Sequence, residues 1–183
     1  PSIIDQYEAG IKKDFWKGIL STNITVYQIT NSNLAQTAEF KADGTTPNTD
    51  TTIKTLSGET KSKGIEVDVT AKPIEGLNII AGYSYNDMRY TKTTGANGSF
   101  IEGDRLVRTP ANTANLSFFY TLQSGALKGI SFGAIGNYIG DRFGGWNNTY
   151  DSTKPNGIND REIPLQGYTT IDASVGYNWD NFS

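Results

Sequence analysis

The stretch from residue 58 to residue 87 constrains the fold most, because two apolar–polar alternations flank one short turn. The first half alternates apolar with polar side chains at Ile65, Glu66, Val67, Asp68, Val69 and Thr70. The second half repeats the alternation at Leu77, Asn78, Ile79, then Ala81, Gly82, Tyr83, Ser84 and Tyr85. A period of two places alternate side chains on opposite faces of a sheet. Pro73 and Gly76 favour a tight turn between the halves. The sequence therefore predicts a hairpin with one apolar and one polar face.

Each arm of this hairpin is longer than the five or six residues usual in globular strands. Long, two-faced strands occur in large soluble sandwiches or barrels. They also occur in outer-membrane barrels, where about ten residues cross the bilayer.

Composition excludes several classes of function. The chain has 183 residues and a net charge of −3, which gives no electrostatic support for nucleic-acid binding. Cysteine and histidine are both absent, so disulfides, thiol nucleophiles, most zinc sites and histidine-based catalytic triads are excluded. No stretch shows convincing helical periodicity, and we predict an all-β protein.

Seven strands are expected along the chain. They lie at residues 3–15, 19–31, the two arms of the hairpin at 58–92, 107–122, 130–143 and 167–179. In the second strand Leu20, Ile24 and Val26 occupy one face. Tyr27 and Ile29 break this phase, which predicts a bulge or the end of the spanning region there.

Short and long connections alternate between these strands. The short turns lie at 16–18, 73–76 and 123–129, and the long loops at 32–57, 93–106 and 144–166. In an up-and-down antiparallel meander, the short turns then share one rim and the long loops the other. This layout is typical of outer-membrane barrels, and a sandwich has no reason to sort its loops in this way. Aromatic residues near the strand ends agree with two bilayer interfaces: Tyr83, Tyr85, Tyr90, Tyr177 and Trp179.

Carboxylates on the polar faces indicate a wide aqueous interior. Glu66, Asp68 and Asp172 would be costly in a small packed core. In a large barrel they would face water or a polar plug. The alternative is that they lie on the wet face of a one-sided antiparallel sheet.

Seven strands would leave two open edges, which lipid does not tolerate, and bacterial barrels normally have an even number of strands. We therefore expect the chain to be a segment of a longer protein.

Four segments in order resemble the carboxy-terminal barrel of TonB-dependent outer-membrane receptors, most closely the ferric-siderophore branch. They are residues 7–18, 58–91, 108–122 and 163–179. The resemblance implies that residues 1–183 form part of one transmembrane barrel domain of about 22 strands, roughly strands 13 to 19. It also implies an amino-terminal plug inside the barrel, and energy supplied by the TonB complex through the plug. Neither the plug nor the last strands are among these residues.

Candidate ligand-binding residues lie in or beside the long loops. Arginine offers donors in a fixed fork that suits the oxygens of an anionic chelate, and aromatic rings stack on planar ligands. The candidates are Arg105, Arg108, Arg142 and Arg161, with Phe100, Phe143, Trp146 and Tyr150. The alternatives for each are interfacial anchoring, lipopolysaccharide contact or an ordinary surface ion pair.

No catalytic constellation, metal site or cofactor motif is identified. Residues 151–160 lack the oxygen spacing and terminal glutamate of a calcium loop. The chain is predicted not to be an enzyme.

The leading hypothesis is an outer-membrane receptor that binds a ferric-siderophore-type chelate outside the cell and passes it to the periplasm with TonB-supplied energy. Its expected partners are the chelate, outer-membrane lipid and lipopolysaccharide, and the TonB complex. Two alternatives stay open. One is a receptor or porin for another nutrient, such as an oligosaccharide or cobalamin. The other is a soluble β-sandwich carbohydrate-binding module.

Overall fold

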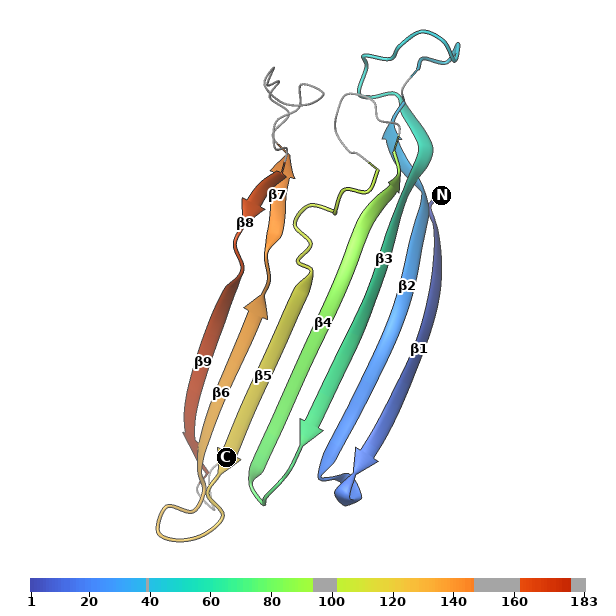
Figure 1. The fold of residues 1–183 in the computed structure, drawn as a ribbon. Helices are drawn as coiled ribbons and strands as arrows, with labels where there is room; N and C mark the ends of the chain where they lie inside the picture. The colour runs from blue at the N-terminus through green and yellow to red at the C-terminus, as the bar shows by residue number, and fades with distance from the viewer. Residues whose placement is uncertain (39, 94–101, 147–161, 179–183) are drawn as a thin grey trace.

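Seven strands of the chain form one antiparallel sheet in which every strand lies beside its neighbour in sequence (Figure 1). The computed structural model describes residues 1–38, 40–93, 102–146 and 162–178. The sheet has the order β1 (Ile3–Phe15), β2 (Leu20–Thr37), β3 (Lys54–Ala71), β4 (Leu77–Lys92), β5 (Asn112–Thr121), β6 (Ile130–Ile139) and β9 (Tyr168–Tyr177). This arrangement confirms the predicted seven-stranded meander.

The register between the strands separates the two faces of the sheet, because directly paired residues point to the same side. A polar row crosses six strands at Asn23, Asp68, Gly82, Asn115, Asn137 and Thr170. The adjacent row, on the other face, is Ile11, Ile24, Val67, Tyr83, Ala114 and Tyr138. The apolar band is therefore continuous from β1 to β6. It continues into β9, where Ile171, Ala173 and Val175 occupy it. We call the two sides the polar face and the apolar face.

No second layer covers the apolar face within the described part of the chain. The only buried hydrophobic residues there are Ala38 and Ala111, whereas Ile11, Leu116 and Ile171 are 73%, 55% and 77% exposed. A sandwich core would bury these side chains between two sheets. The described strands thus give no support to the β-sandwich alternative. None of the described helical segments is long and apolar enough to span a membrane.

The connections are sorted by length, as the sequence predicts (Figure 1). Three short ones lie at one end of the sheet. The first is the single turn η1 (Trp16–Gly18), and the second places Gly76 at φ +82°. In the third, Gly129 donates to the Leu122 carbonyl over 2.9 Å. The longer connections, which follow β2, β4 and β6, lie at the opposite end.

Several predicted boundaries are wrong at the end with the long connections. β2 and β3 extend to Thr37 and from Lys54, so the loop between them is only residues 38–53. The paired ends of β2 and β3 carry mostly polar residues and show no apolar–polar alternation. Water contacts both faces of the sheet at this end, so neither face requires apolar side chains. The fifth strand starts at Asn112 rather than at residue 107.

The predicted strand 130–143 is divided. β6 ends at Ile139, and β7 (Arg142–Trp146) then pairs with β8 (Glu162–Leu165) in a separate small sheet. The two strands therefore lie at the two ends of the predicted loop 144–166, and β7 starts two residues before it, inside the predicted strand. At the break, the Gly167 amide donates to the Asp141 carboxylate over 2.6 Å and the Gly140 amide donates to the Asn112 carbonyl over 2.8 Å.

Of the two interpretations of the phase break at Tyr27 and Ile29, a bulge or the end of the spanning region, the structure contradicts the bulge. The register between β2 and β3 is unbroken through both residues, which lie on the polar face. The irregularity falls later, between Asn31 and Leu34, where Asn33 has φ +58°.

Candidate functional site

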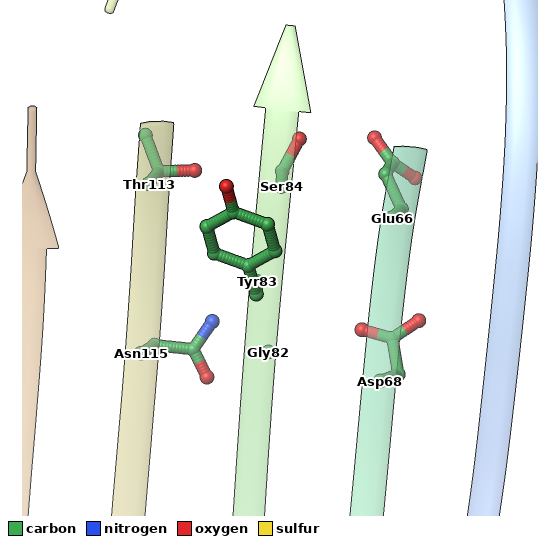
Figure 2. A pocket seen from close by; sticks show the side chains of 7 residues that line it. All are labelled: Glu66, Asp68, Gly82, Tyr83, Ser84, Thr113 and Asn115. Atoms are coloured by element: carbon green, nitrogen blue, oxygen red, sulfur yellow. The ribbon is translucent and has the colours of Figure 1, made fainter. Parts of the chain in front are cut away.

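The polar face of β3, β4 and β5 contains a shallow hollow of about 210 Å³ (Figure 2). Its lining is rich in oxygen and nitrogen atoms, and the polar-face residues are Glu66, Asp68, Gly82, Ser84, Thr113 and Asn115. Tyr83, whose register position is on the apolar face, also borders it. Glu66 and Asp68 are two residues apart on β3, so strand geometry places both carboxylates on the same face. The Asn23 side-chain amide donates to Asp68 over 3.4 Å. The hollow can accept hydrogen bonds from, and attract, a cationic or amide-rich partner.

A second hollow of about 330 Å³ continues this surface across β1 to β4. Glu66 lines both hollows, which joins them into one polar surface. Within the second one, the Ser62 hydroxyl donates to the Asn86 side-chain oxygen over 2.6 Å, and Ser62 is only 6% exposed. No group of three carboxylates that could hold a metal ion occurs in the described ranges. The surface offers carboxylates, amides and hydroxyls as hydrogen-bonding groups.

Arg142 lies at the end of the polar face where the long connections gather. Its guanidinium lies over the ring of Tyr168, 5.4 Å from the ring centroid. Tyr168 pairs with Ile139, which pairs with Thr113, and this register places Tyr168 on the polar face. The Nη1 atom of Arg142 is buried and has no hydrogen-bond partner among the described residues. A guanidinium with an unused donor attracts an anionic acceptor.

The structure brings two other candidates beside Arg142. The Arg108 amide donates to the Phe143 carbonyl over 2.6 Å, so the segment before β5 and the start of β7 are joined. Trp146 ends β7 and pairs with Glu162. Phe100, Tyr150 and Arg161 lie outside the described residues.

Arg105 lies apart from this group. It forms an antiparallel bridge with Arg89, and its Nε is 3.8 Å from Asp87 Oδ1. The register of β4 places Asp87 and Arg89 on the apolar face, in line with Tyr83 and Tyr85. Arg105 and Arg142 therefore lie on opposite faces of the sheet.

Tyr168 is a partner of Arg142 that the sequence reasoning missed. Its position on the polar face could have been predicted, because Tyr168 lies two and four residues before Thr170 and Asp172, which face the same side of β9. The break after Ile139, which brings Arg142 over this ring, has no comparable signal in the sequence.

The loop 38–53 is held by its own side chains. Asp43 accepts hydrogen bonds from the Thr46 hydroxyl and from the amides of Thr45 and Thr46, over 2.5, 3.0 and 2.9 Å. These bonds, the Thr46 hydroxyl first, lower the pKa of Asp43 from 3.8 to about 2. Asn48, 4% exposed, donates to the carbonyls of Ala38 and Asp50 and accepts from the Asp50 amide, each over 2.9 Å.

The family model for the TonB-dependent receptor-like β-barrel matches residues 1–183, the whole chain. The chain belongs to the TonB-dependent receptor β-barrel family. This confirms the resemblance seen in the sequence. The family consists of transport receptors rather than enzymes, and its members are outer-membrane barrels. The apolar face of this TonB-dependent receptor segment is therefore the lipid-facing side, and the polar face is the lumenal side.

Curated relatives of this TonB-dependent receptor segment share about a quarter of its residues. The metal-pseudopaline receptor CntO of Pseudomonas aeruginosa is 29% identical over 171 residues, which are 93% of this chain and 21% of that protein. The ferrioxamine B receptor of Salmonella typhimurium is 28% identical over 173 residues, or 94% and 21% of the two chains. The chain thus spans about a fifth of the length of these relatives.

Solved structures show the same fold. The ferripyoverdine receptor of Pseudomonas aeruginosa superposes with a TM-score of 0.70 at 21% identity, covering 99% of this chain and 22% of that one. The ferric-catecholate import receptor Fiu of Escherichia coli gives a TM-score of 0.67 at 22% identity, covering 97% and 22%.

Proposed function

We propose that this chain is part of an outer-membrane receptor that binds a ferric-siderophore-type chelate outside the cell and passes it to the periplasm with TonB-supplied energy. Relatives named as receptors for ferrioxamine B and metal-pseudopaline support this cargo class. In this proposal residues 1–183 belong to one barrel domain and catalyse no reaction.

The observation that carries the proposal is the position of Arg142. In this proposal its cation is at the extracellular end of the lumenal face, with Tyr168 as an aromatic surface beside it. Its Nη1 atom has no hydrogen-bond partner among the described residues. Siderophore chelates are commonly anionic and carry carboxylate, hydroxamate or phenolate oxygens. An arginine fork can bind two such oxygens at once. Arg108, Phe143, Trp146, Tyr150 and Arg161 remain candidates for the same vestibule.

The acidic lumenal surface has a separate role in the proposal. Glu66 and Asp68 would face the plug domain, because their side chains lie on the lumenal face of β3. Donors of the plug would satisfy these carboxylates, since buried charges require partners. The TonB complex would act on the plug, and outer-membrane lipid and lipopolysaccharide would surround the apolar face.

The proposal is tested by substituting Arg142 in the intact receptor. We expect Arg142→Gln to weaken binding of a recognised ferric chelate by roughly tenfold or more, since a charge-assisted hydrogen bond contributes about 1.5–3 kcal/mol. Arg142→Lys keeps the charge but loses the forked guanidinium, so its affinity for the chelate should lie between those of the parent receptor and Arg142→Gln. Lys13→Gln removes an exposed cation from the opposite rim and is the matched control.

The assay measures uptake and equilibrium binding across a panel of ferric siderophores, with cobalamin and maltooligosaccharides as competing cargo classes. Saturable uptake of one ferric chelate that requires TonB supports the cargo assignment. Saturable uptake of cobalamin or an oligosaccharide instead would overturn it. Chelate binding that is unchanged by Arg142→Gln would remove this residue from the site.

A further inference from the structure

The pairing of β6 with β9 continues into β7 and β8 in the same register, beyond a short break (Figure 1). Ile139 pairs with Tyr168, and Arg142, three residues later, pairs with Leu165, three residues earlier. Neither arm therefore has an inserted residue at the break. The ladder is interrupted only at the two cross-strand positions between these pairs. The cause of the interruption lies in the residues at those positions.

One side-chain bond and two close backbone approaches replace the missing ladder. The Gly167 amide donates to the Asp141 carboxylate over 2.6 Å, a charge-assisted bond from backbone to side chain. A Cβ on Gly167 would lie 2.8 Å from the Ile139 carbonyl oxygen. A Cβ on Gly140 would lie 2.8 Å from the Asn112 carbonyl oxygen. Glycine at both positions therefore permits the close packing of backbone that the break requires.

The break brings Arg142 to the other face of the sheet. Tyr138 points to the apolar face, so alternation continued through residue 142 would place Arg142 on that face as well. Its guanidinium instead lies over the ring of Tyr168, 5.4 Å from the centroid, on the polar face. Uninterrupted strands would keep the Arg142 and Tyr168 side chains on opposite sides of the sheet. Their contact therefore depends on the break.

We propose that Asp141 is a positioning residue for the chelate site, because its bond to Gly167 holds the break that turns Arg142 toward the lumen. The other edge of β7 is bound separately, since the Arg108 amide donates to the Phe143 carbonyl over 2.6 Å. Removing the Asp141 bond should therefore leave β7 beside β8 and change the direction of Arg142. The inference rests on the proposed function for its chelate measurements, whereas the direction of residue 142 can be measured without a chelate.

Variants of Asp141 in the intact receptor separate its hydrogen bond from its charge. Asp141→Ala removes the acceptor, whereas Asp141→Asn keeps an oxygen that can accept from the Gly167 amide. Asp141→Ser, whose oxygen is one bond closer to the backbone, should behave as Asp141→Ala does. Asp5→Ala is the matched control, because Asp5 is an exposed carboxylate on the apolar face at the same end of the sheet. A heat-dependent change in gel migration, the mark of a folded barrel, is checked for every variant.

Cross-linking measures the direction of residue 142 without a chelate. The chain has no cysteine of its own, so cysteine pairs are introduced into an otherwise cysteine-free receptor. We expect a short bifunctional thiol reagent to join Arg142→Cys/Tyr168→Cys and Arg142→Cys/Leu165→Cys in the parent. With Asp141→Ala the first link should be largely lost and the second retained, since β7 and β8 stay paired. Equal yields of the first link with and without Asp141 would overturn the proposal.

A double-mutant cycle shows whether Asp141 acts through Arg142. The probe is the ferric siderophore that the uptake panel identifies. We expect Asp141→Ala to weaken its binding by up to the roughly tenfold lost with Arg142→Gln, and Asp141→Asn and Asp5→Ala to bind as the parent does. Asp141→Ala/Arg142→Gln should bind as Arg142→Gln alone does, because no guanidinium is left to be positioned.

Two binding results would overturn the positioning role. Additive losses in the double variant would mean that each residue acts on its own, and an equal loss in Asp141→Asn would mean that the charge matters rather than the bond to Gly167. Unchanged binding in Arg142→Gln would instead remove the chelate site of the proposed function. The cross-linking yields would then still decide whether Asp141 directs residue 142.

Discussion

The ring of Tyr27 lies across Gly64, its cross-strand partner on the lumenal face. A Cβ on Gly64 would collide with the Tyr27 hydroxyl and with the Tyr85 carbonyl oxygen. Asn115 lies over Gly82, and Phe119 over Gly133, in the same way. Barrel curvature crowds the inner face, and glycines leave room there for long side chains of the next strand.

Gly64→Ala should therefore destabilise the barrel by about 1–3 kcal/mol, the usual cost of overpacking. Gly136→Ala is the matched control, because no atom lies within 4 Å of a Cβ added at Gly136. Urea unfolding of the intact receptor in detergent measures both. Tyr27→Ala should not fully rescue Gly64→Ala, since the collision with the Tyr85 carbonyl remains. Equal midpoints for the two glycine variants would contradict this account.

Leu116 and Asn115 are adjacent on β5 and point to opposite faces. We expect Leu116→Arg to destabilise the folded barrel by about 2–4 kcal/mol, because it places a charge near the middle of the hydrocarbon. Asn115→Arg should be nearly neutral, since its side chain faces the lumen beside Asp68 and Glu66. Refolding titrations into lipid vesicles compare the pair. Similar losses in both would mean that the faces are assigned incorrectly.

The loop 38–53 should loosen in acid as Asp43 takes up a proton. Its pKa in the folded state, about 2, lies below the ordinary 3.8, so the carboxylate stabilises the loop above pH 3.8 and that contribution is lost toward pH 2. Pepsin cleavage near Phe40 should rise over this interval. Asp43→Asn cannot accept all three hydrogen bonds. Its cleavage by pepsin should therefore already be high above pH 3.8 and should not rise further between pH 3.8 and pH 2. A parallel rise in both proteins would reflect the protease alone.

Asn48 holds the base of the same loop through its buried amide. Asn48→Asp should disrupt the loop more than Asn48→Ala, because it turns an oxygen toward the carbonyls of Ala38 and Asp50. Loss of the bonded groups costs about 1–3 kcal/mol locally. Hydrogen exchange of residues 38–53 reports the change, and Thr51→Ala at an exposed position is the control. Faster exchange should be confined to the loop, since the strands keep their pairing.

Strand faces could be predicted from the sequence because a membrane barrel imposes a period of two. Lipid selects apolar side chains on one side, and the lumen permits polar ones on the other, so Ile65 and Glu66 already show the orientation of β3. Above the bilayer this selection ends. The extension of β2 to Thr37 and the start of β3 at Lys54 therefore carry no alternation to detect.

Alternation and spacing along the chain were enough to predict the all-β class, the seven strands with their two faces and the sorting of connections, and the resemblance of four segments predicted the family. Which loop residues meet could be seen only once the strands were in register. The tertiary structure placed Arg142 over Tyr168 through the break after Ile139, and it aligned Arg105 with Arg89 and Lys61 on the lipid side. These contacts join residues from different strands and loops. They depend on register and on backbone breaks, which local periodicity does not specify.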